Sequence, residues 1–427
     1  MFRVVLLAVF GAFAVAGVMV FAMFVGKDEG GSLGTVRIWG TIDDAAFGEV
    51  LTKSLENGGP LSGVVYEKKD PATYEKALTN ALANGEGPDL FILRENQVFR
   101  NLGKIYVLPP ETHPLSKFES TFVDVVSPFT NDKGIAGIPI LVDPLVLYWN
   151  KDMLATAGYA KPPSFWDELI GMAQKITVKD ETGTIKRSAI AMGEYRNVTN
   201  AKEILATLIL QAGGRITAFD EQRALRAALA PQSGSESQAA VSALRFYTEF
   251  ANPSKEIYTW NRSLLESQRA FAGGDVALYI GYASEESAIR RTNANLNYGV
   301  APLPQIRSNS TSLNTARVYG IAVSRTSTNL QGAVTAATLL AGADFAGPLA
   351  QGLGMTSARR ELLSTPGTGN ADIFNKQTII ARSWTDPDPE ATAEIFRAMI
   401  ENTTSGAVLI NEAVQRADLE LTQILAI

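Results

Sequence analysis

Aromatic rings, carboxylates and amides recur along this chain at points where strands end or loops begin. Flat rings can stack on the apolar C–H faces of a polar molecule, while carboxylates and amides exchange hydrogen bonds with its hydroxyl groups. The residues that we assign to such a ligand-binding site are Trp39, Asp43, Asp44, Glu95, Asn96, Asp143, Tyr195, Trp260, Tyr282, Arg317, Tyr319 and Trp384. We predict no catalytic residue and no metal ligand among them.

Three tryptophans and a tyrosine are the candidate ring platforms. Trp384 lies in the polar turn ARSWTDP and Trp260 follows Tyr258 in another loop, where large rings are difficult to bury. Trp260 can equally serve the surfaces on which two lobes close. Tyr282 and Trp39 each stand at or near the end of an apolar strand. The rings therefore lie in different sequence contexts, loops for two and strand ends for two, and ordinary packing is the competing interpretation for each.

Asp143 is a single acid in the apolar run GIPILVDPLVLYW. A lone charge inside such a strand costs on the order of several kcal/mol, so it needs either an ionic partner or a ligand cleft. Arg317 is one possible partner. Arg317 and Tyr319 precede a predicted strand at 320–324, where either Asp143 or a ligand hydroxyl can be met.

The N-terminal third alternates strands with helices. Strands are predicted at 36–39, 63–67 and 88–93, with helices starting at Asp43 and Asp44 and spanning 74–83. This βαβ pattern builds a parallel sheet, and ligands of open α/β sheets lie beyond the carboxyl ends of the strands. The rule selects residues 39–44 and 94–97, which include Glu95 and Asn96.

The middle and the end of the chain are mostly helical. Helices are predicted at 166–177, 201–211 and 238–251, and again from Asn329 onward. At 427 residues the chain is too long for one ordinary core, so two lobes are expected.

Two stretches of sequence carry the pattern of a known family. Residues 137–169 read GIPILVDPLVLYWNKDMLATAGYAKPPSFWDEL, which combines a buried strand, an asparagine-lysine-acid helix start and a proline-tryptophan helix start. Residues 270–304 contain AFAGGDVALYIGY and then NYGVAPLP. In this order they resemble the extracellular solute-binding proteins of ABC importers (family 1, the maltose-binding-protein-like group). The resemblance runs from near Thr35 to the C-terminus.

This resemblance implies a fold and a division of the chain. The implied fold is α/β and two-lobed, of the periplasmic-binding-protein-like type II, with a mostly parallel sheet in each lobe and a ligand cleft between them. The implied segments are 1–34 for an anchor or signal and linker, 35–140 with 284–322 for the first lobe, and 141–283 with 323–427 for the second. Hinge bending near 139–143, 282 and 322 would close the lobes on a ligand.

The resemblance also implies roles for individual residues. Asp143 matches a sugar-binding glutamate of the family's hinge strand, and Glu95 with Asn96 matches its ligand loop. Tyr195 matches an aromatic that the second lobe contributes, and Trp384 a tryptophan that stacks on sugar. The ligand-loop tryptophan is replaced here by residues 94–96, so maltodextrin itself is not implied. Another oligosaccharide, a sugar phosphate ester and a non-sugar polar solute all remain open.

Composition limits the classes of ligand, partner and cofactor that the protein is expected to bind. A net charge of −6 and a pI near 5.2 argue against nucleic acid and suit an uncharged ligand. The chain has no cysteine, which excludes disulfides and cysteine-held metals. Its one histidine, His113, disfavours a histidine-dependent triad. We therefore expect no cofactor.

The N-terminal segment bears on location. The stretch from Val4 to Val25 has no charged residue and is long enough to cross a bilayer core of about 30 Å. Its flanking charges favour an N-terminus inside and the main body outside. A retained membrane anchor is one interpretation, and a signal peptide cleaved after the small residues Ala14 to Ala16 is the other. Either places the protein outside the cytoplasm, at the cell surface or in the periplasm.

The predicted function is a receptor that binds a carbohydrate solute and passes it to an ABC permease. A surface adhesion or sensory protein with the same fold is the main alternative. A glycoside-acting enzyme is a further alternative, because carboxylate pairs such as Glu95 and Asp143 exist. No nucleophile elbow or phosphate loop supports catalysis.

Overall fold

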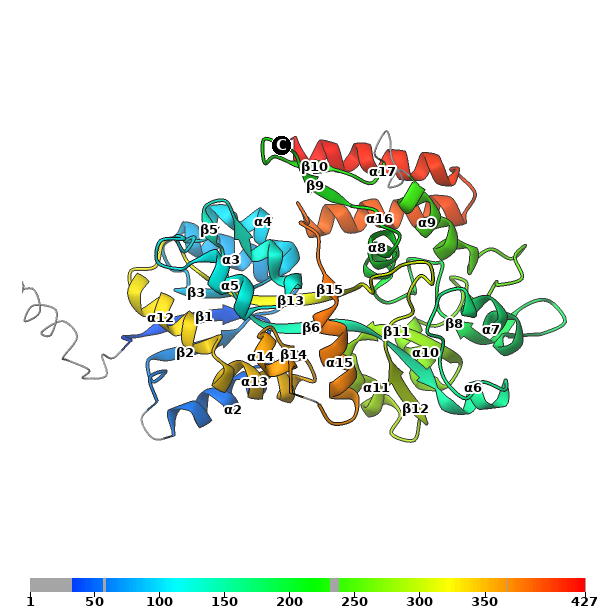
Figure 1. Cartoon of the computed structure of the whole chain (residues 1–427), viewed down its shortest axis with the longest axis horizontal. Coiled ribbons are helices and arrows are strands. Elements are labelled where there is room, and N and C mark those ends of the chain that lie inside the picture. The colour runs from blue at the N-terminus through cyan, green and yellow to red at the C-terminus, as the bar shows by residue number, and fades with distance from the viewer. Residues whose placement is uncertain (1–32, 57–58, 231–237, 366, 427) are drawn as a thin grey trace, which may run out of the picture.

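One long strand, β6 (Ile138–Asn150), runs through the middle of the molecule and belongs to both of its halves. The computed structural model describes residues 33–56, 59–230, 238–365 and 367–426 (Figure 1). The described strands are β1 Val36–Gly40, β2 Val64–Lys68, β3 Leu90–Arg94, β4 Thr130–Asn131, β5 Gly134–Ile135, β6, β7 Val178–Lys179, β8 Ile185–Ile190, β9 Thr217–Phe219, β10 Leu225–Ala227, β11 Val276–Tyr282, β12 Tyr298–Ala301, β13 Asn314–Val323, β14 Thr356–Ser357 and β15 Ala381–Arg382.

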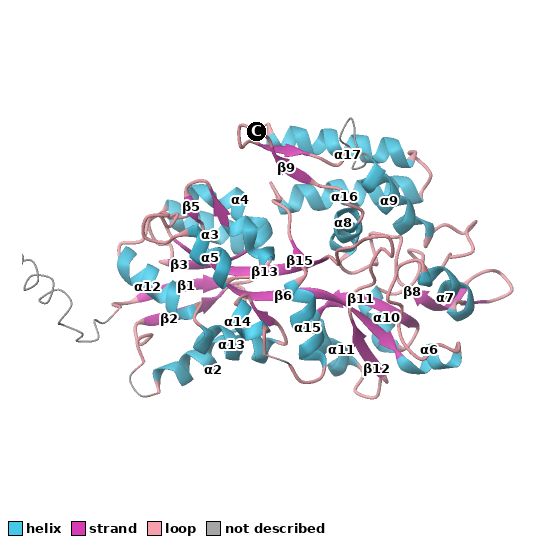
Figure 2. Ribbon diagram, in the orientation of Figure 1, coloured by secondary structure: helices cyan, strands magenta, loops and turns pink. Residues whose placement is uncertain are grey.

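Helices pack on both sides of these strands (Figure 2). They are α2 Asp44–Leu55, α3 Tyr74–Ala83, α4 Val98–Asn101, α5 Leu115–Thr121, α6 Lys151–Thr156, α7 Glu168–Ile176, α8 Ala201–Gln211, α9 Ala239–Glu249, α10 Ser267–Gly273, α11 Glu286–Thr292, α12 Leu330–Leu340, α13 Ala343–Leu353, α14 Arg360–Leu363, α15 Asn370–Ile379, α16 Pro389–Thr404 and α17 Ile410–Leu425.

The main sheet is mixed and continuous through both halves. It has 11 strands along the path β2-β1-β3-β13-β6-β11-β8-β7, with β12 and β14 joined to β6 and β15 joined to β13. The predicted βαβ units are present, because β1 pairs in parallel with β2 and β3. Strand β13 runs antiparallel between β3 and β6 and so connects the N-terminal strands to the centre.

Local sequence signals explain where several elements begin. Asp43 caps α2 by accepting hydrogen bonds from the backbone N–H groups of Ala45 and Ala46. Asn150 does the same for α6 through the N–H of Met153, at 3.0 Å. Gly158 then ends that segment with a φ of 83°, a left-handed conformation that glycine adopts without strain.

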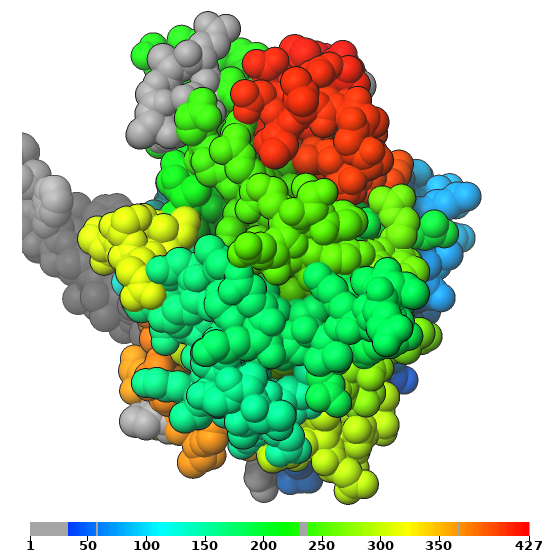
Figure 3. Space-filling model, turned by 90° about the vertical axis from the view of Figure 1, so that its right-hand side faces the viewer, coloured from blue at the N-terminus to red at the C-terminus, as the bar shows by residue number. Residues whose placement is uncertain are grey.

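The buried side chains form two cores, and β6 supplies both. Its residues 138 and 140–142 pack in the first core with β1, β3 and β13, whereas residues 145–148 pack in the second with α8, α9 and β11. Asp143 and Pro144 lie between these two apolar runs. The predicted two-lobed α/β fold is therefore present, with β6 as a strand common to both lobes. The prediction of a mostly parallel sheet in each lobe was wrong, because β6 pairs antiparallel with β11, β12 and β13 in one mixed sheet. Figure 3 shows the second lobe end-on, with α17 in red above the green middle of the chain.

The division of the chain between the cores differs from the sequence-based one in two segments. Strand β12 pairs with the second half of β6, and residues 289, 300, 301 and 303 are buried in the second core rather than the first. Helices α12 and α13 bury Ala333, Ala337 and Leu349 in the first core rather than the second. The reason is that α12 and α13 are apolar enough to cover a sheet of either lobe, and only the path of β13 decides which.

The segment from Val4 to Val25 lies outside the described residues. Within the described part of the chain, no single helix combines the length and hydrophobicity needed to cross a membrane. The pair α12 and α13 meets those criteria only together, and the two helices are bent by 59° at their junction.

Candidate functional site

A cleft opens between the two lobes beside the carboxyl end of β3. Its first-lobe wall is formed by Arg94, Glu95 and Asn96, which follow that strand, and by the start of β13 around Arg317. Strands β3 and β13 are hydrogen-bonded neighbours, with Tyr319 opposite Arg94. The strand-end rule applied to the sequence thus finds one side of the site.

The facing wall comes from the second lobe. Lys202 and Glu203 project from the first turn of α8, and Trp384 and Asp386 come from the segment that joins β15 to α16. The Trp384 ring stacks on Phe396 with centroids 6.4 Å apart. Two aromatic rings, Tyr282 and Trp384, and several charged groups therefore share one narrow space.

The cleft has two adjoining chambers. The inner one, beside Tyr282 and Trp384, has a cavity volume of about 40 Å³, and the outer one, beside Tyr195, about 320 Å³. Asn96 and Glu203 line both chambers, so the two chambers lie side by side. The outer chamber lies within the size range of small-molecule pockets, whereas the inner one has room for only a few waters. A large ligand can enter fully only if the lobes separate.

Two buried polar atoms on the first-lobe wall lack hydrogen-bond partners. They are Oδ1 of Asn96, an acceptor, and Nε of Arg317, a donor. The Arg317 guanidinium lies 3.7 Å from the ring centroid of Tyr282, and its Nη2 donates to Oδ1 of Asn200 at 3.1 Å. Unsatisfied buried groups cost free energy, so these two atoms mark where a polar ligand would be stabilised.

Glu95 and Glu203 differ in environment although both line the cleft. Oε2 of Glu95 accepts a 2.6 Å hydrogen bond from the backbone N–H of Val318, and burial raises the pKa of Glu95. The carboxylate of Glu203 makes no hydrogen bond or ion pair with any described residue. Glu203 is therefore the acid most available to accept a ligand hydroxyl.

Asp143 lies close to the cleft without lining it. It is fully buried, and its two oxygens accept hydrogen bonds from the N–H of Ser284 at 2.9 Å and from its Oγ at 2.7 Å. It stands opposite Arg317 in the β6–β13 register; the guanidinium attracts the carboxylate, but the two side chains form no ion pair within 4 Å. Burial raises the pKa of Asp143 to about 6. In this structure Asp143 ties the shared strand to the turn after β11.

Four of the predicted site residues are occupied elsewhere. Asp43 caps α2 and, with Asp44, pairs with Lys68 at 3.1 and 3.5 Å. Lys69 covers the Trp39 ring at 3.6 Å. Trp260 is 1% exposed, because the second core encloses its ring. The Trp260 indole donates to Oδ1 of Asn197, which fixes it away from the ligand space.

Two predicted tyrosines lie nearer the cleft. Tyr319 is partly buried against the first core and stands opposite Arg94, a residue of the first-lobe wall. Tyr195 is half-buried beside the outer chamber, and burial raises its pKa to about 12. Its neighbour Glu194 turns inward and pairs with Arg262 at 3.3 Å.

Lys202, Glu203 and Asp386 were not found from the sequence. Lys202 is buried, and its ammonium contacts Oδ2 of Asp386 at 2.8 Å and Oγ1 of Thr392 at 2.5 Å. Burial raises the pKa of Asp386. The signal for Lys202 and Glu203 was an adjacent base and acid in the first turn of the predicted helix at 201–211, which is too common a pattern to select them. The Lys202 nitrogen also lies 5.4 Å from the Trp384 ring centroid.

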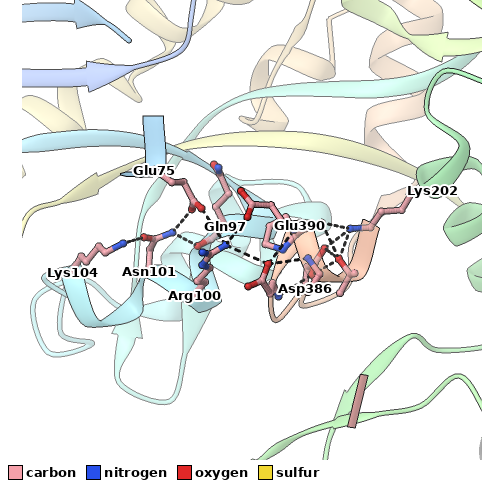
Figure 4. A network of polar contacts seen from close by, with 12 residues as sticks. Glu75, Gln97, Arg100, Asn101, Lys104, Lys202, Asp386 and Glu390 are labelled. Carbon is pink, nitrogen blue, oxygen red and sulfur yellow. Dashed lines mark hydrogen bonds and ion pairs between the residues drawn. The ribbon is translucent and has the colours of Figure 1, made fainter. Parts of the chain in front are cut away.

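A network of polar contacts spans the cleft mouth (Figure 4). Arg100 on α4 lies 3.4 Å from Glu75 within the first lobe. The same guanidinium lies 3.3 Å from Asp388 and 3.8 Å from Glu390, at the start of α16 in the second lobe. Arg100 therefore links the lobes across the entrance.

Comparison with known families decides where the chain belongs. A family model described as bacterial extracellular solute-binding protein matches residues 44–346, which is more than half of the chain. The chain belongs to this family. The family prediction from sequence is confirmed, and the family description places its members outside the cell. Curated relatives in Brucella abortus and Brucella suis, named as binding proteins, are 27% identical over 162 residues. That match spans 38% of this chain and 39% of the relatives' length.

Several solved structures share the fold. A cyclo/maltodextrin-binding protein complexed with maltotetraose has a TM-score of 0.74 at 17% identity, covering 93% of this chain and 98% of the other. The sugar-binding protein MalE of Xanthomonas citri gives 0.73 at 21% identity, with coverages of 92% and 97%. The GacH receptor of Streptomyces glaucescens gives 0.69 at 20% identity, with coverages of 92% and 98%. At these identities the likeness establishes the two-lobed fold.

Proposed function

We propose that this solute-binding protein captures a carbohydrate in the cleft between its lobes and delivers it to an ABC permease. The observation that carries the proposal is that the Trp384 ring and the unpartnered Glu203 carboxylate line the same interlobe cleft. A ring for the apolar face of a sugar and an acid for its hydroxyls are the two groups that such a ligand needs. Structural relatives whose names record maltotetraose and acarbose as ligands add support.

Binding and closure would be coupled. A ligand that contacts Asn96 on one wall and Glu203 on the other favours the closed arrangement by its differential affinity for that state. The bend would occur in β6 at Asp143 and Pro144, where the two apolar runs meet. The closed form would then dock on the permease.

Calorimetry with a panel of mono- and oligosaccharides tests this function. We expect Trp384→Ala to weaken binding of the tightest ligand by about 2 kcal/mol, roughly 30-fold in Kd, because a central ring is lost. Glu203→Gln should weaken it roughly 10- to 100-fold, the usual range for a hydrogen bond to a charged group. Glu221→Gln, an exposed acid in the turn between β9 and β10, is the matched control.

The same purified protein distinguishes the proposed function from a non-sugar receptor and from an enzyme. If no saccharide binds, but an amino acid or a polyamine does, the carbohydrate assignment fails. Release of a product from a glycoside by the purified chain would favour the enzyme. We propose binding without turnover, because the family and its structural relatives are binding proteins.

The membrane anchor is a further part of the proposal. Its support is the uncharged stretch from Val4 to Val25. Intact mass and detergent-phase partition of the protein isolated from its native membrane distinguish a retained anchor from a cleaved signal segment. A mature protein that starts after Ala16 and stays in the aqueous phase would contradict the anchor.

A further inference from the structure

Two of the four cationic side chains that line the cleft are already neutralised. Lys202 pairs with Asp386 at 2.8 Å, and Arg382 pairs with Asp124 at 2.9 Å. Each carboxylate balances its partner's charge, so neither cation is available to an incoming anion. The other two, Arg94 and Arg317, have no carboxylate within 4 Å among the residues that the structure describes.

The two free guanidiniums are neighbours on the first-lobe wall. Tyr319 on β13 stands opposite Arg94 on β3, and Arg317 is two residues before Tyr319. Side chains two apart on a strand point to the same face, so Arg94 and Arg317 are diagonal neighbours, with Cβ atoms about 7–8 Å apart in such pairs. Like charges in this relation repel each other unless an anion lies between them.

Arg317 is also held rigidly. Its guanidinium carbon lies 3.7 Å from the centroid of the Tyr282 ring, one Nη2 hydrogen bond goes to Asn200, and Nε has no acceptor. A guanidinium fixed in this way loses little entropy when it binds, and its planar fork matches a carboxylate in two parallel hydrogen bonds.

Three acids act on this pair from beyond ion-pair distance: Glu95 on both guanidiniums, and Glu203 and Asp143 on Arg317. Glu95 attracts both guanidiniums, but its Oε2 accepts the N–H of Val318, and burial raises its pKa. Glu203 lies on the opposite wall, on α8, and contacts neither arginine within 4 Å. The first-lobe wall therefore carries two guanidiniums beside one buried acid, and the facing wall carries the Glu203 carboxylate.

We infer that the preferred ligand is an acidic saccharide whose acid group lies between Arg94 and Arg317 while its hydroxyls reach Glu203. This inference rests on the carbohydrate function proposed above and narrows its substrate class. The overall negative charge of the chain favours a neutral ligand at long range, but these two arginines set the local preference. A uronate fits the planar fork, and a sugar phosphate shares the same anionic chemistry.

Matched ligand pairs test the inference on the full chain by calorimetry. The probes are galactose against galacturonate, their short oligomers, and galactose 6-phosphate. We expect an acidic sugar to bind roughly 10- to 100-fold more tightly than its neutral counterpart, as for hydrogen bonds to charged groups. Whichever of uronate and phosphate binds more tightly identifies the acid group. Raising NaCl from 0.05 to 0.5 M should reduce this advantage.

Substitutions locate the effect. Arg94→Met and Arg317→Met should each bring the ratio of the two dissociation constants towards one, and Arg94 is only partly buried, so its variant is expected to fold. Arg307→Gln, an exposed arginine paired with Asp167 away from the cleft, should leave the ratio unchanged.

The two levels of proposal fail in different ways. Neutral sugars that bind as tightly as the acidic ones, in wild type and in Arg94→Met alike, would overturn the acidic preference and keep the carbohydrate function. Absence of binding by every saccharide, neutral or acidic, would overturn the function itself.

Discussion

At the scale of single residues, burial separates the ligand candidates from packing residues. Trp384 and Trp260 both lie in loops between polar residues, yet Trp384 lines the cleft and Trp260 is enclosed by the second core. The sequence predicts that a ring stands in a loop, but not whether distant helices cover it. Glu203 shows the converse, because its lack of a partner depends on groups far away in the sequence.

Asp143 should make stability depend on pH. Its pKa is 3.8 as a free side chain and about 6 in the fold, so between pH 4 and 6 the folded state holds a proton that the unfolded state has released. Stability therefore falls as pH rises through this window, by about 3 kcal/mol from this group. Urea unfolding of wild type and Asp143→Asn from pH 4 to 7 measures the difference. Parallel profiles for the two proteins would contradict this assignment.

At the scale of elements, a buried ion pair holds the ligand-side loop. Lys202 on α8 anchors Asp386, two residues after Trp384, and Thr392 on α16 donates to the same carboxylate. The sequence predicts α8 at 201–211, which is where it lies, because its apolar spacing and its glycine stop are local. The loop that it fastens is 184 residues away in the chain, and no local pattern reports that contact.

Removing one partner of this pair should be costly. Lys202→Met leaves a buried carboxylate uncompensated, so we expect a loss of about 3–5 kcal/mol in the free energy of unfolding. The double variant Lys202→Met/Asp386→Asn should lose much less than the sum of the single variants. Denaturant titration provides all three values, and additive losses would contradict a coupled pair. Lys53→Met, in an exposed pair with Glu49, is the control and should not shift the midpoint.

At the scale of the whole molecule, two lobes share one sheet and face each other across a nearly closed inner chamber. The alternation of strands and helices predicts the first lobe, and length predicts a second. Which helices cover which lobe is not predicted, because α12 and α13 carry an apolar surface that fits either. That choice depends on the antiparallel return of β13, a long-range pairing.

Arg100 should bias the lobes towards closure. Its contacts to Asp388 and Glu390 bridge the cleft mouth, so Arg100→Ala should lengthen the distance between labels on the two lobes. The chain has no cysteine, so Glu111→Cys and Gln415→Cys give unique spin-label sites on exposed positions. High salt should produce the same shift in wild type, and pulsed electron paramagnetic resonance measures it.

The control for this effect is an ion pair that stays within one helix. Arg397 contacts Glu394 and Glu401 on α16 and bridges no lobes, so Arg397→Ala should leave the label distance unchanged. An equal distance in Arg100→Ala and wild type, at low and at high salt, would show that the contact does not restrain opening.

The composition of the first core has a consequence for biosynthesis. Its buried residues extend from Val36 to Ala381, with the second-lobe segment that contains β11 inserted between them. A ribosome must therefore deliver most of the chain before α12 and α13 can cover the first sheet, so this lobe cannot mature as an early, self-contained unit. Until then its apolar strands stay exposed, which is a state that holding chaperones recognise and that an export channel can thread.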